Sequence, residues 1–301
     1  MRPIRSLLLY LVPIVLAAAL FGPWLYWSAQ GLAQHWHAFD KLSQAPFHRY
    51  VHRGLLLFAL LGLWPFLRTA RIGSLRELGL GRGEAPGRML SAGFALSFTS
   101  LACVAFLGIW AGARRFNLDL SASALLGRTS NAALSALVVA VLEEVVFRGA
   151  LFGAFRKAHD WKVALFTSSA VYGLVHFFAK PTPPTEITWS SGLQMLPEMM
   201  RGFTDIRLLV PGLFILTLAG MILGLAYHQT GNLYFSIGLH AGWIFWLKIY
   251  GAVTIARAGA NTWLWGSGKL IDGWSTLIIV GPVLLIMWLV QRNKPALTHA
   301  R

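Results

Sequence analysis

The stretch Ala140-Val-Leu-Glu-Glu-Val-Val-Phe-Arg-Gly-Ala150 places three charged side chains in a segment that otherwise has the composition of a lipid-soluble helix. No charged residue occurs from Asn131 to Leu142, and the eleven residues after Glu144 contain only Arg148. A charge at membrane depth costs on the order of 3 kcal/mol on insertion scales. Glu143, Glu144 and Arg148 therefore need partners, and they indicate either an active site or a polar clamp between helices.

The composition of the whole chain is typical of an integral membrane protein. Of its 301 residues, 56% are hydrophobic and 12% are charged, whereas a soluble domain has about 25% charged residues. The net charge of +15 would suggest nucleic-acid binding in a soluble chain. Here the basic residues flank apolar segments, as they do in loops on the cytoplasmic side of a membrane. We expect the lipid bilayer, and no nucleic acid, as a partner.

Long apolar runs predict an all-α fold, a polytopic transmembrane helix bundle with about eight spanning helices. A helix needs about 20 apolar residues to cross the hydrocarbon. The first run is too long for the apolar part of a signal peptide, so we expect it to be retained as a helix. The eight runs lie near residues 7–28, 49–67, 90–112, 131–155, 161–179, 207–228, 233–252 and 274–290.

Basic residues gather on one side of this predicted bundle, in the N-terminus, the loops after the second and fourth spans, and the C-terminal tail. That side is predicted to be cytoplasmic, with both termini inside, which fits a multi-pass protein of a prokaryotic inner membrane. The opposite side carries Arg114, Arg115 and Arg128, so the charge bias is moderate. The residues on the cytoplasmic side are Arg2, Arg5, Arg68, Arg71, Arg76, Arg82, Arg88, Arg156, Lys157, Lys162, Arg292, Lys294 and Arg301.

The longest connection between predicted spans, residues 180–206, has two parts. It begins with Pro181 and the pair Pro183 and Pro184, which exclude regular helix. Its later part is amphipathic enough to lie at the membrane interface. Two interpretations stay open, a passive outer loop and a lid beside the site.

Helix geometry assigns different environments to the two glutamates. Glu144 and Arg148 are four residues apart with the acid first, which is the better orientation for an ion pair on one helix face. Glu143 points about 100° away and has no cation on its own face within this helix. It must find partners elsewhere, as a general base does when it is poised near neutral pH.

His176 and His240 are the candidate partners, each within another apolar run. A single intramembrane histidine is usually a hydrogen-bond partner between helices. Two histidines with a glutamate pair can instead supply a base for water, an orienting group and a donor for the oxyanion of a hydrolysis reaction. The set Glu143, His176 and His240 could also bind zinc. The residues alone leave these options open.

Three motifs in sequence order are similar to those of the CAAX protease and bacteriocin-processing (CPBP) family of intramembrane proteases. They are Glu143–Arg148, Tyr172–His176 and the stretch Gly224–His240, and together they cover roughly residues 130–250. The resemblance implies a catalytic transmembrane core at 130–252. Residues 1–129 are then N-terminal helices without an assigned role, and residues 253–301 form a C-terminal helix and a cytoplasmic tail.

The resemblance also implies a role for each residue. Glu143 activates the attacking water with help from His176. Glu144 and Arg148 order the site, and His240 helps to stabilise the tetrahedral oxyanion. No cofactor is expected, although a divalent metal such as zinc stays an alternative.

Two positions depart from the family pattern. The second motif usually begins with Phe, and here it begins with Tyr172. The third motif usually has Asn four residues after its histidine, and here that position is Ile244. If that Asn donates to the oxyanion, this chain either replaces it with a neighbour such as Tyr172 or has reduced activity.

The sequence therefore predicts an intramembrane endopeptidase that hydrolyses a peptide bond of a membrane-anchored protein or peptide. The alternative is a non-catalytic membrane scaffold or transporter in which the Glu, Arg and His residues clamp helices or line a pathway. Eight regular spans would place the glutamates near the middle of their helix, His176 at one membrane face and His240 toward the other. A single site would then require tilted or offset helices.

Overall fold

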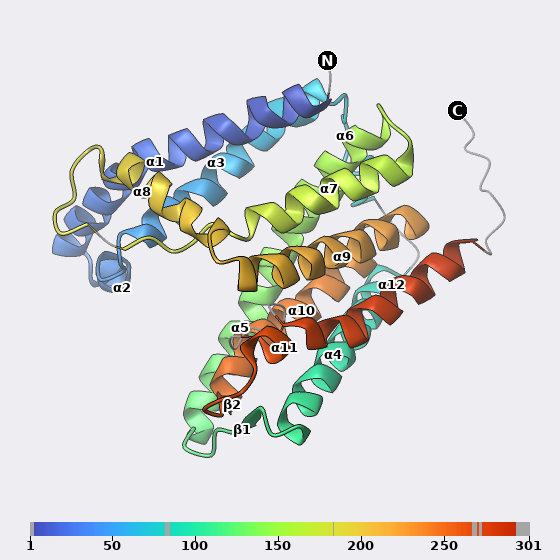
Figure 1. The fold of residues 1–301 in the computed structure, drawn as a ribbon. Helices are drawn as coiled ribbons and strands as arrows, with labels where there is room; N and C mark the ends of the chain where they lie inside the picture. The colour runs from blue at the N-terminus through green and yellow to red at the C-terminus, as the bar shows by residue number, and fades with distance from the viewer. Residues whose placement is uncertain (1–2, 82–84, 183, 267–269, 271–272, 293–301) are drawn as a thin grey trace. The chain divides into compact units, whose positions relative to one another are not determined.

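The computed structural model describes residues 3–81, 85–182, 184–266, 270 and 273–292. Almost all of this part of the chain is helical (Figure 1), which confirms the predicted all-α class. Of the basic residues assigned to the cytoplasmic side, Arg2, Arg82, Lys294 and Arg301 lie outside the described residues.

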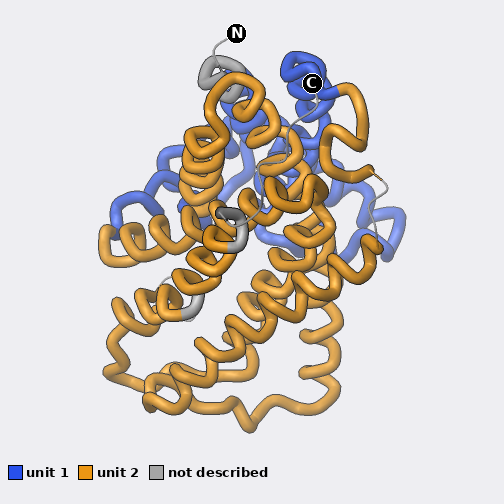
Figure 2. Tube along the Cα trace, turned by 90° about the vertical axis from the view of Figure 1, so that its right-hand side faces the viewer, with its two compact units in different colours: residues 1–72, 177–205 blue, residues 73–176, 206–301 orange. Residues whose placement is uncertain are grey.

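The helices form two compact units (Figure 2). The first unit contains residues 1–72 and 177–205, and the second contains residues 73–176 and 206–301. This division follows packing. The predicted division at residues 129 and 252 follows sequence motifs and stays a prediction.

The first unit pairs two long helices, α1 (Pro3–His35) and α3 (His48–Thr69). They pack closely, since a Cβ added to Gly54 of α3 would lie 3.3 Å from the Cα of Ala18 in α1. The 180–206 connection contributes α8 (Ser191–Met199), which begins after the prolines and packs against α1. Three short helices complete the unit: η1 (His37–Phe39), α2 (Asp40–Ser43) and η3 (Met200–Phe203).

Helix α8 is amphipathic, as predicted for the later part of that connection. Four of its residues are buried and share one face, namely Ser191, Gly192, Met195 and Met199. The lid interpretation of this segment stays a prediction.

The second unit contains the three motifs, and side-chain caps begin two of its helices. Ser121 Oγ accepts from the Ala124 N–H at the start of α5, and Asp160 Oδ1 accepts from the Lys162 N–H at the start of α7. The elements of this unit are α4 (Pro86–Trp110), β1 (Arg114–Phe116), α5 (Ala122–Glu144), η2 (Val145–Phe152), α6 (Gly153–Arg156), α7 (Trp161–Val175), α9 (Ile206–Thr230), α10 (Tyr234–Val253), β2 (Thr254–Ala256), α11 (Thr262–Trp265), η4 (Trp274–Thr276) and α12 (Leu277–Arg292).

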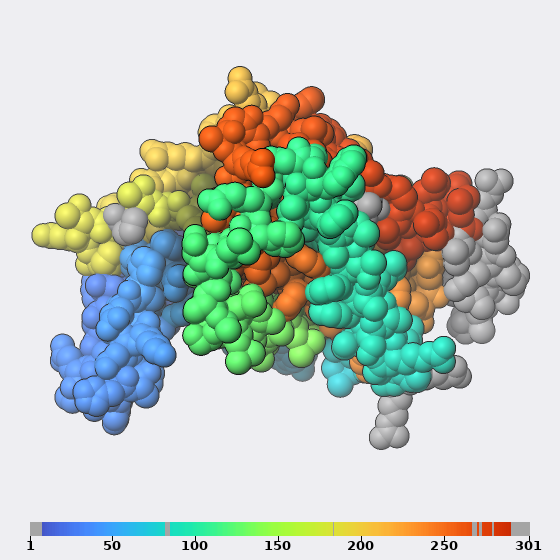
Figure 3. All heavy atoms as spheres, turned by 90° about the horizontal axis from the view of Figure 1, so that it is seen from below, coloured from blue at the N-terminus to red at the C-terminus, as the bar shows by residue number. Residues whose placement is uncertain are grey.

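Helix α10 is the central helix of this unit, and every residue from Ser236 to Ile244 is buried. It packs against α4 on one side and α5 on another. In Figure 3, orange atoms, the colour of α10, lie between the teal α4 and the green α5. The third motif is therefore enclosed by protein.

Glycines let α10 approach α4 at backbone distance. A Cβ added to Gly238 would lie 2.0 Å from the Leu90 carbonyl oxygen, and one added to Gly242 would lie 2.0 Å from Ser97 Oγ. Small residues four apart permit this kind of close helix packing in membranes. Gly238 and Gly242 form a glycine seam against α4. Side chains two residues apart on a helix point about 200° apart, so His240 lies on the opposite face of α10 from this seam. The glycines thereby direct His240 away from α4.

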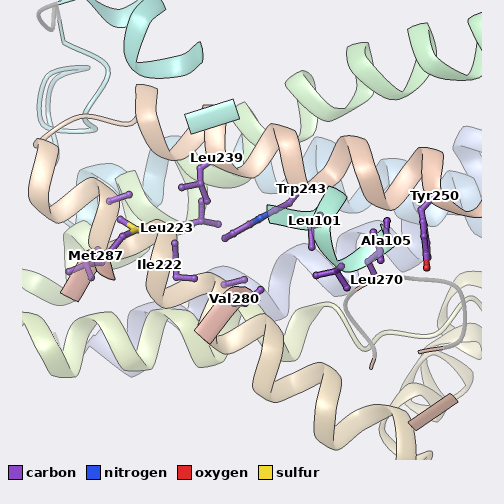
Figure 4. Packing of buried hydrophobic residues seen from close by; sticks show 14 residues of the cluster. Leu101, Ala105, Ile222, Leu223, Leu239, Trp243, Tyr250, Leu270, Val280 and Met287 are labelled. Carbon is purple, nitrogen blue, oxygen red and sulfur yellow. The ribbon is translucent and has the colours of Figure 1, made fainter. Parts of the chain in front are cut away.

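An apolar cluster joins α4, α9, α10 and α12 around this seam (Figure 4). The indole of Trp243 lies near its centre and donates to Ser100 Oγ of α4 at 3.1 Å. Ile222, Leu223 and Leu239 are fully buried in the same cluster. Their packing fixes α10 between α4 and α9.

A short antiparallel pairing of β1 with β2 ties the ends of α4 and α10 together. Arg114 is buried there, and its guanidinium donates to Thr254 Oγ1 at 2.8 Å and to the Thr254 carbonyl oxygen at 3.1 Å. Its positive charge therefore has a structural role, which explains one of the basic residues on the predicted outer side.

In the part of the chain that the structure describes, four helices are long and apolar enough to cross a membrane, and each matches a predicted span. The predicted count of eight spans is not confirmed in the described residues. Helix α7, for example, has 15 residues, about 22 Å of helix against about 30 Å of hydrocarbon. Spanning by the other predicted segments stays a prediction. The four helices are Leu8–His35, His48–Thr69, Pro86–Trp110 and Ile206–Thr230.

The glycine seam gives a test of the fold. Gly238→Ala should lower the free energy of unfolding by about 1–3 kcal/mol, because the added methyl overpacks the Leu90 backbone. Gly127→Ala in α5 is the matched control, since no atom lies within 4 Å of its added Cβ. The control should be neutral or stabilising by up to about 1 kcal/mol. Denaturation in detergent measures both, and equal effects of the two variants would contradict the seam.

Candidate active site

The first motif lies where an α-helix widens into a π-helix. Helix α5 ends at Glu144, and the π-helical segment η2 follows from Val145 to Phe152. The prediction of a regular helix over residues 131–155 is therefore wrong in its local geometry, although the chain stays helical throughout. Wide π turns of this kind occur frequently at functional sites. Gly149 in η2 permits close packing, because its Cβ would lie 2.9 Å from the Leu78 carbonyl oxygen.

The predicted ion pair of the first motif is present and buried. Arg148 Nη1 lies 2.9 Å from Glu144 Oε1, and the Glu144 side chain is 0% exposed. The Nη1 hydrogens do not point along this contact, so it is an ion pair without a linear hydrogen bond. Arg148 Nη2 donates to the Gly220 carbonyl oxygen of α9 at 3.4 Å. The arginine thus joins the first motif to α9.

His240 is the second partner of Glu144. Its Nδ1 lies 3.0 Å from Glu144 Oε1. A carboxylate paired with arginine can only accept hydrogen bonds, so His240 Nδ1 carries the proton. In a neutral His240 ring, Nε2 is then the acceptor.

Glu143 has a different environment, as its helix face predicted. Its Oε2 lies 3.8 Å from His176 Nε2 and 3.7 Å from His240 Nε2, beyond direct hydrogen-bond distance. Oε2 has no hydrogen-bond partner among the described residues. The Glu143 side chain is 25% exposed and lines a cavity of about 100 Å³. Of the two glutamates, Glu143 is the one that a small molecule can reach.

The second motif supplies a histidine with a defined tautomer. His176 follows the last residue of α7, and its Nδ1 lies 2.7 Å from the Tyr172 carbonyl oxygen. A carbonyl oxygen only accepts, so Nδ1 donates. In the neutral ring, Nε2 is left as an acceptor that faces Glu143.

The structure brings all five predicted site residues together, in helices α5 and α10, in η2 and at the end of α7. The offset in depth that eight regular spans would produce does not occur. Helix α7 ends at Val175, earlier than the predicted span end at 179. His176 follows directly, and its Nε2 lies 3.8 Å from Glu143 Oε2. The catalytic roles of these residues stay predictions.

Tyr172 is a further member of this cluster, which the sequence singled out as a departure from the family pattern and as a neighbour that could replace the missing Asn. Its hydroxyl lies 3.1 Å from His240 Nε2. Its ring packs edge-on against Phe147 and lies under the Arg148 guanidinium, with 4.3 Å from Cζ to the ring centre. The i, i+4 spacing of Tyr172 and His176 was the signal for this placement.

Hydrophobic side chains make up most of the cavity wall. Apolar walls lower the local dielectric and so strengthen electrostatic interactions inside. Ile244, at the position where the family pattern has Asn, is part of this wall. The residues that line the cavity are Leu101, Val139, Glu143, Tyr172, His176, Ile215, Leu216, Ala219, His240, Trp243, Ile244, Leu247, Thr276 and Val280.

The zinc alternative concerns Glu143, His176 and His240. The two separations of 3.7 and 3.8 Å from Glu143 Oε2 exceed the roughly 3.4 Å between two ligands of a tetrahedral zinc with bonds of about 2.1 Å. No group of three His, Cys, Asp or Glu residues in the described part of the chain has the arrangement of a metal site.

Comparison with known proteins supports the resemblance of the motifs. Residues 126–246 match the sequence model of a family described as type II CAAX prenyl endopeptidase Rce1-like. The match covers about two fifths of the chain and includes all five predicted site residues. No curated protein and no solved structure gives a match. This match confirms the resemblance to the CPBP family for residues 126–246.

The buried charges give a test of the site's energetics. Arg148→Gln should lower the free energy of unfolding by about 3–5 kcal/mol, because it leaves Glu144 buried without its main partner. The control is Lys157→Gln, which removes an exposed ion pair of 3.4 Å to Glu77 and should cost at most about 1 kcal/mol. Equal losses for the two variants in detergent denaturation would contradict a buried pair.

Proposed function

We propose that the protein is an intramembrane endopeptidase that hydrolyses a peptide bond of a membrane-anchored protein or peptide. One observation carries the proposal: Glu143 lines the cavity, and its Oε2 faces Nε2 of both His176 and His240 at 3.8 and 3.7 Å. The description of the matching family, a CAAX prenyl endopeptidase, supports the same reaction class.

In the proposed reaction, a water molecule lies between Glu143 and His176. It donates one hydrogen to Glu143 Oε2 and the other to His176 Nε2, which is an acceptor because Nδ1 donates to Tyr172. Glu143 takes the first proton while the water oxygen attacks the carbonyl carbon of the peptide bond. The electron pair of the C=O bond moves onto oxygen and forms a tetrahedral oxyanion.

The intermediate then collapses, and the C–N bond breaks. The leaving nitrogen takes the proton that Glu143 holds, so Glu143 returns to its ionised form. The products are a carboxylic acid and an amine, and the histidines end in their starting states. The acid then loses its proton to solvent or to the amine and becomes a carboxylate. No covalent bond to the enzyme is required.

Glu144, Arg148 and His240 hold this geometry. Glu144 is fully buried, and its Oε1 contacts both Arg148 and His240, so Glu144 positions these two side chains. His240 is fixed by Glu144 through Nδ1, and its Nε2 points toward the reaction space near Glu143. Groups positioned in this way in a dry site stabilise developing charge without reorganisation.

Glu143→Gln tests the proposal. The amide keeps the shape of the side chain but cannot accept the proton of water, so the cleavage rate should fall by about 10²–10⁴-fold. The assay uses the protein in proteoliposomes with a quenched-fluorescence peptide that ends in a farnesylated CAAX sequence. A chelator titration of the same assay tests the zinc alternative.

The matched control is Glu77→Gln, the same chemical change at an exposed residue outside the cavity, which should cleave at the wild-type rate. A comparison of membrane proteomes from cells with wild-type protein or Glu143→Gln then identifies new termini on native substrates. Equal cleavage by wild type and Glu143→Gln, or identical termini in both proteomes, would favour the scaffold or transporter alternative.

A further inference from the structure

Hydrolysis needs a hydrogen-bond donor for the oxyanion. Residue 244, where the family pattern has Asn, cannot provide one. Ile244 lines the cavity beside Glu143 and His240, and its side chain has no polar atom. Removing one such donor from a hydrolase costs about 10²–10³-fold in rate. If the proposed function holds, another cavity residue must donate.

Most other donors in the cavity wall are already engaged. Trp243 Nε1 donates to Ser100 Oγ at 3.1 Å. The Thr276 hydroxyl donates to the Leu270 carbonyl oxygen. His176 uses its Nδ1 proton on the Tyr172 carbonyl oxygen. Among the polar side chains that line the cavity in the described residues, Tyr172 and His240 are left.

These two side chains are connected in a single line of polar atoms. Glu144 Oε1 lies 3.0 Å from His240 Nδ1, and His240 Nε2 lies 3.1 Å from the Tyr172 hydroxyl oxygen. When both ring nitrogens of His240 carry protons, Nδ1 donates to Glu144 and Nε2 donates to the Tyr172 oxygen. The single hydroxyl proton of Tyr172 is then free to point at a third atom.

We propose that Tyr172 is a further catalytic residue, whose hydroxyl donates a hydrogen bond to the oxyanion in place of the donor that Ile244 lacks. His240 supports the oxyanion through this hydroxyl, because its Nε2 lies 3.1 Å from the Tyr172 oxygen and holds it in place. No proton leaves Tyr172, so the balance of the hydrolysis is unchanged.

The tyrosine ring is held firmly enough for this task. It is 4% exposed and packs against Phe147 at 5.2 Å and His176 at 4.5 Å between ring centres. The Arg148 guanidinium covers its face at 4.3 Å. A donor fixed before the reaction gives its full effect in the transition state.

The test begins with Tyr172→Phe, assayed in the same proteoliposomes with the same farnesylated peptide. This change removes one oxygen and keeps the ring. We expect kcat to fall by about 10²–10³-fold with little change in KM, because the bond forms only in the transition state. Tyr227→Phe is the matched control, since its hydroxyl donates to the Glu77 carbonyl oxygen outside the cavity.

A second substitution separates donation from the positioning of His240. In the Tyr172→Phe background, Ile244→Asn places an amide donor in the cavity wall but does not restore the hydrogen bond to His240 Nε2. We expect it to raise kcat at least about tenfold, as a replacement oxyanion donor would. Ile244→Ser is the smaller substitute if the Asn variant unfolds, which thermal denaturation reports.

A Tyr172→Phe variant with wild-type kcat would overturn the proposal. No recovery with a folded donor variant at 244 would also overturn it and would make Tyr172 a positioning residue for His240. This inference rests on the proposed function. An inactive wild type refutes that function, whereas an active wild type with either of these results refutes the role of Tyr172 alone.

Discussion

The structure of the second unit depends on burying the Glu144 carboxylate. A fully buried charge is tolerable only with close partners of opposite charge and hydrogen-bond donors. Glu144 obtains Arg148 at 2.9 Å from η2 and His240 at 3.0 Å from α10, and Arg148 extends the network to the Gly220 carbonyl oxygen of α9. One carboxylate thereby fixes the relative positions of three segments that are far apart in sequence.

Because Glu144 uses these partners, Glu143 is left without them. Arg148 turns toward Glu144, and the proton on His240 Nδ1 is used there as well. The Nε2 atoms of His176 and His240 face Glu143, at distances that suit an intervening water. The two adjacent glutamates therefore have separate tasks, one in holding the helices and one in facing the cavity.

Local patterns in the sequence predicted the all-α class, the Glu144–Arg148 pair and the isolation of Glu143, because each depends on spacing along one helix. The predicted count of eight membrane-spanning helices is not confirmed. Helix α7 is short and α5 continues as a π-helix, and the length of an apolar run reports neither feature. The convergence of His176 and His240 on Glu143 depends on tertiary packing. Gly238 and Gly242 direct His240 toward the site only because α4 presents its backbone to them. The hydrogen bond between Tyr172 and His240 arises in the same way.

The central claim is that Glu143 activates water and does not attack the substrate itself. A single turnover in H₂¹⁸O, followed by mass spectrometry of the product and of the enzyme peptide that contains Glu143, tests this claim directly. If Glu143 activates water, the new C-terminal carboxylate of the product carries one ¹⁸O atom and Glu143 carries none. Incorporation of ¹⁸O into the Glu143 side chain would show a covalent acyl intermediate and would rule out this role of Glu143.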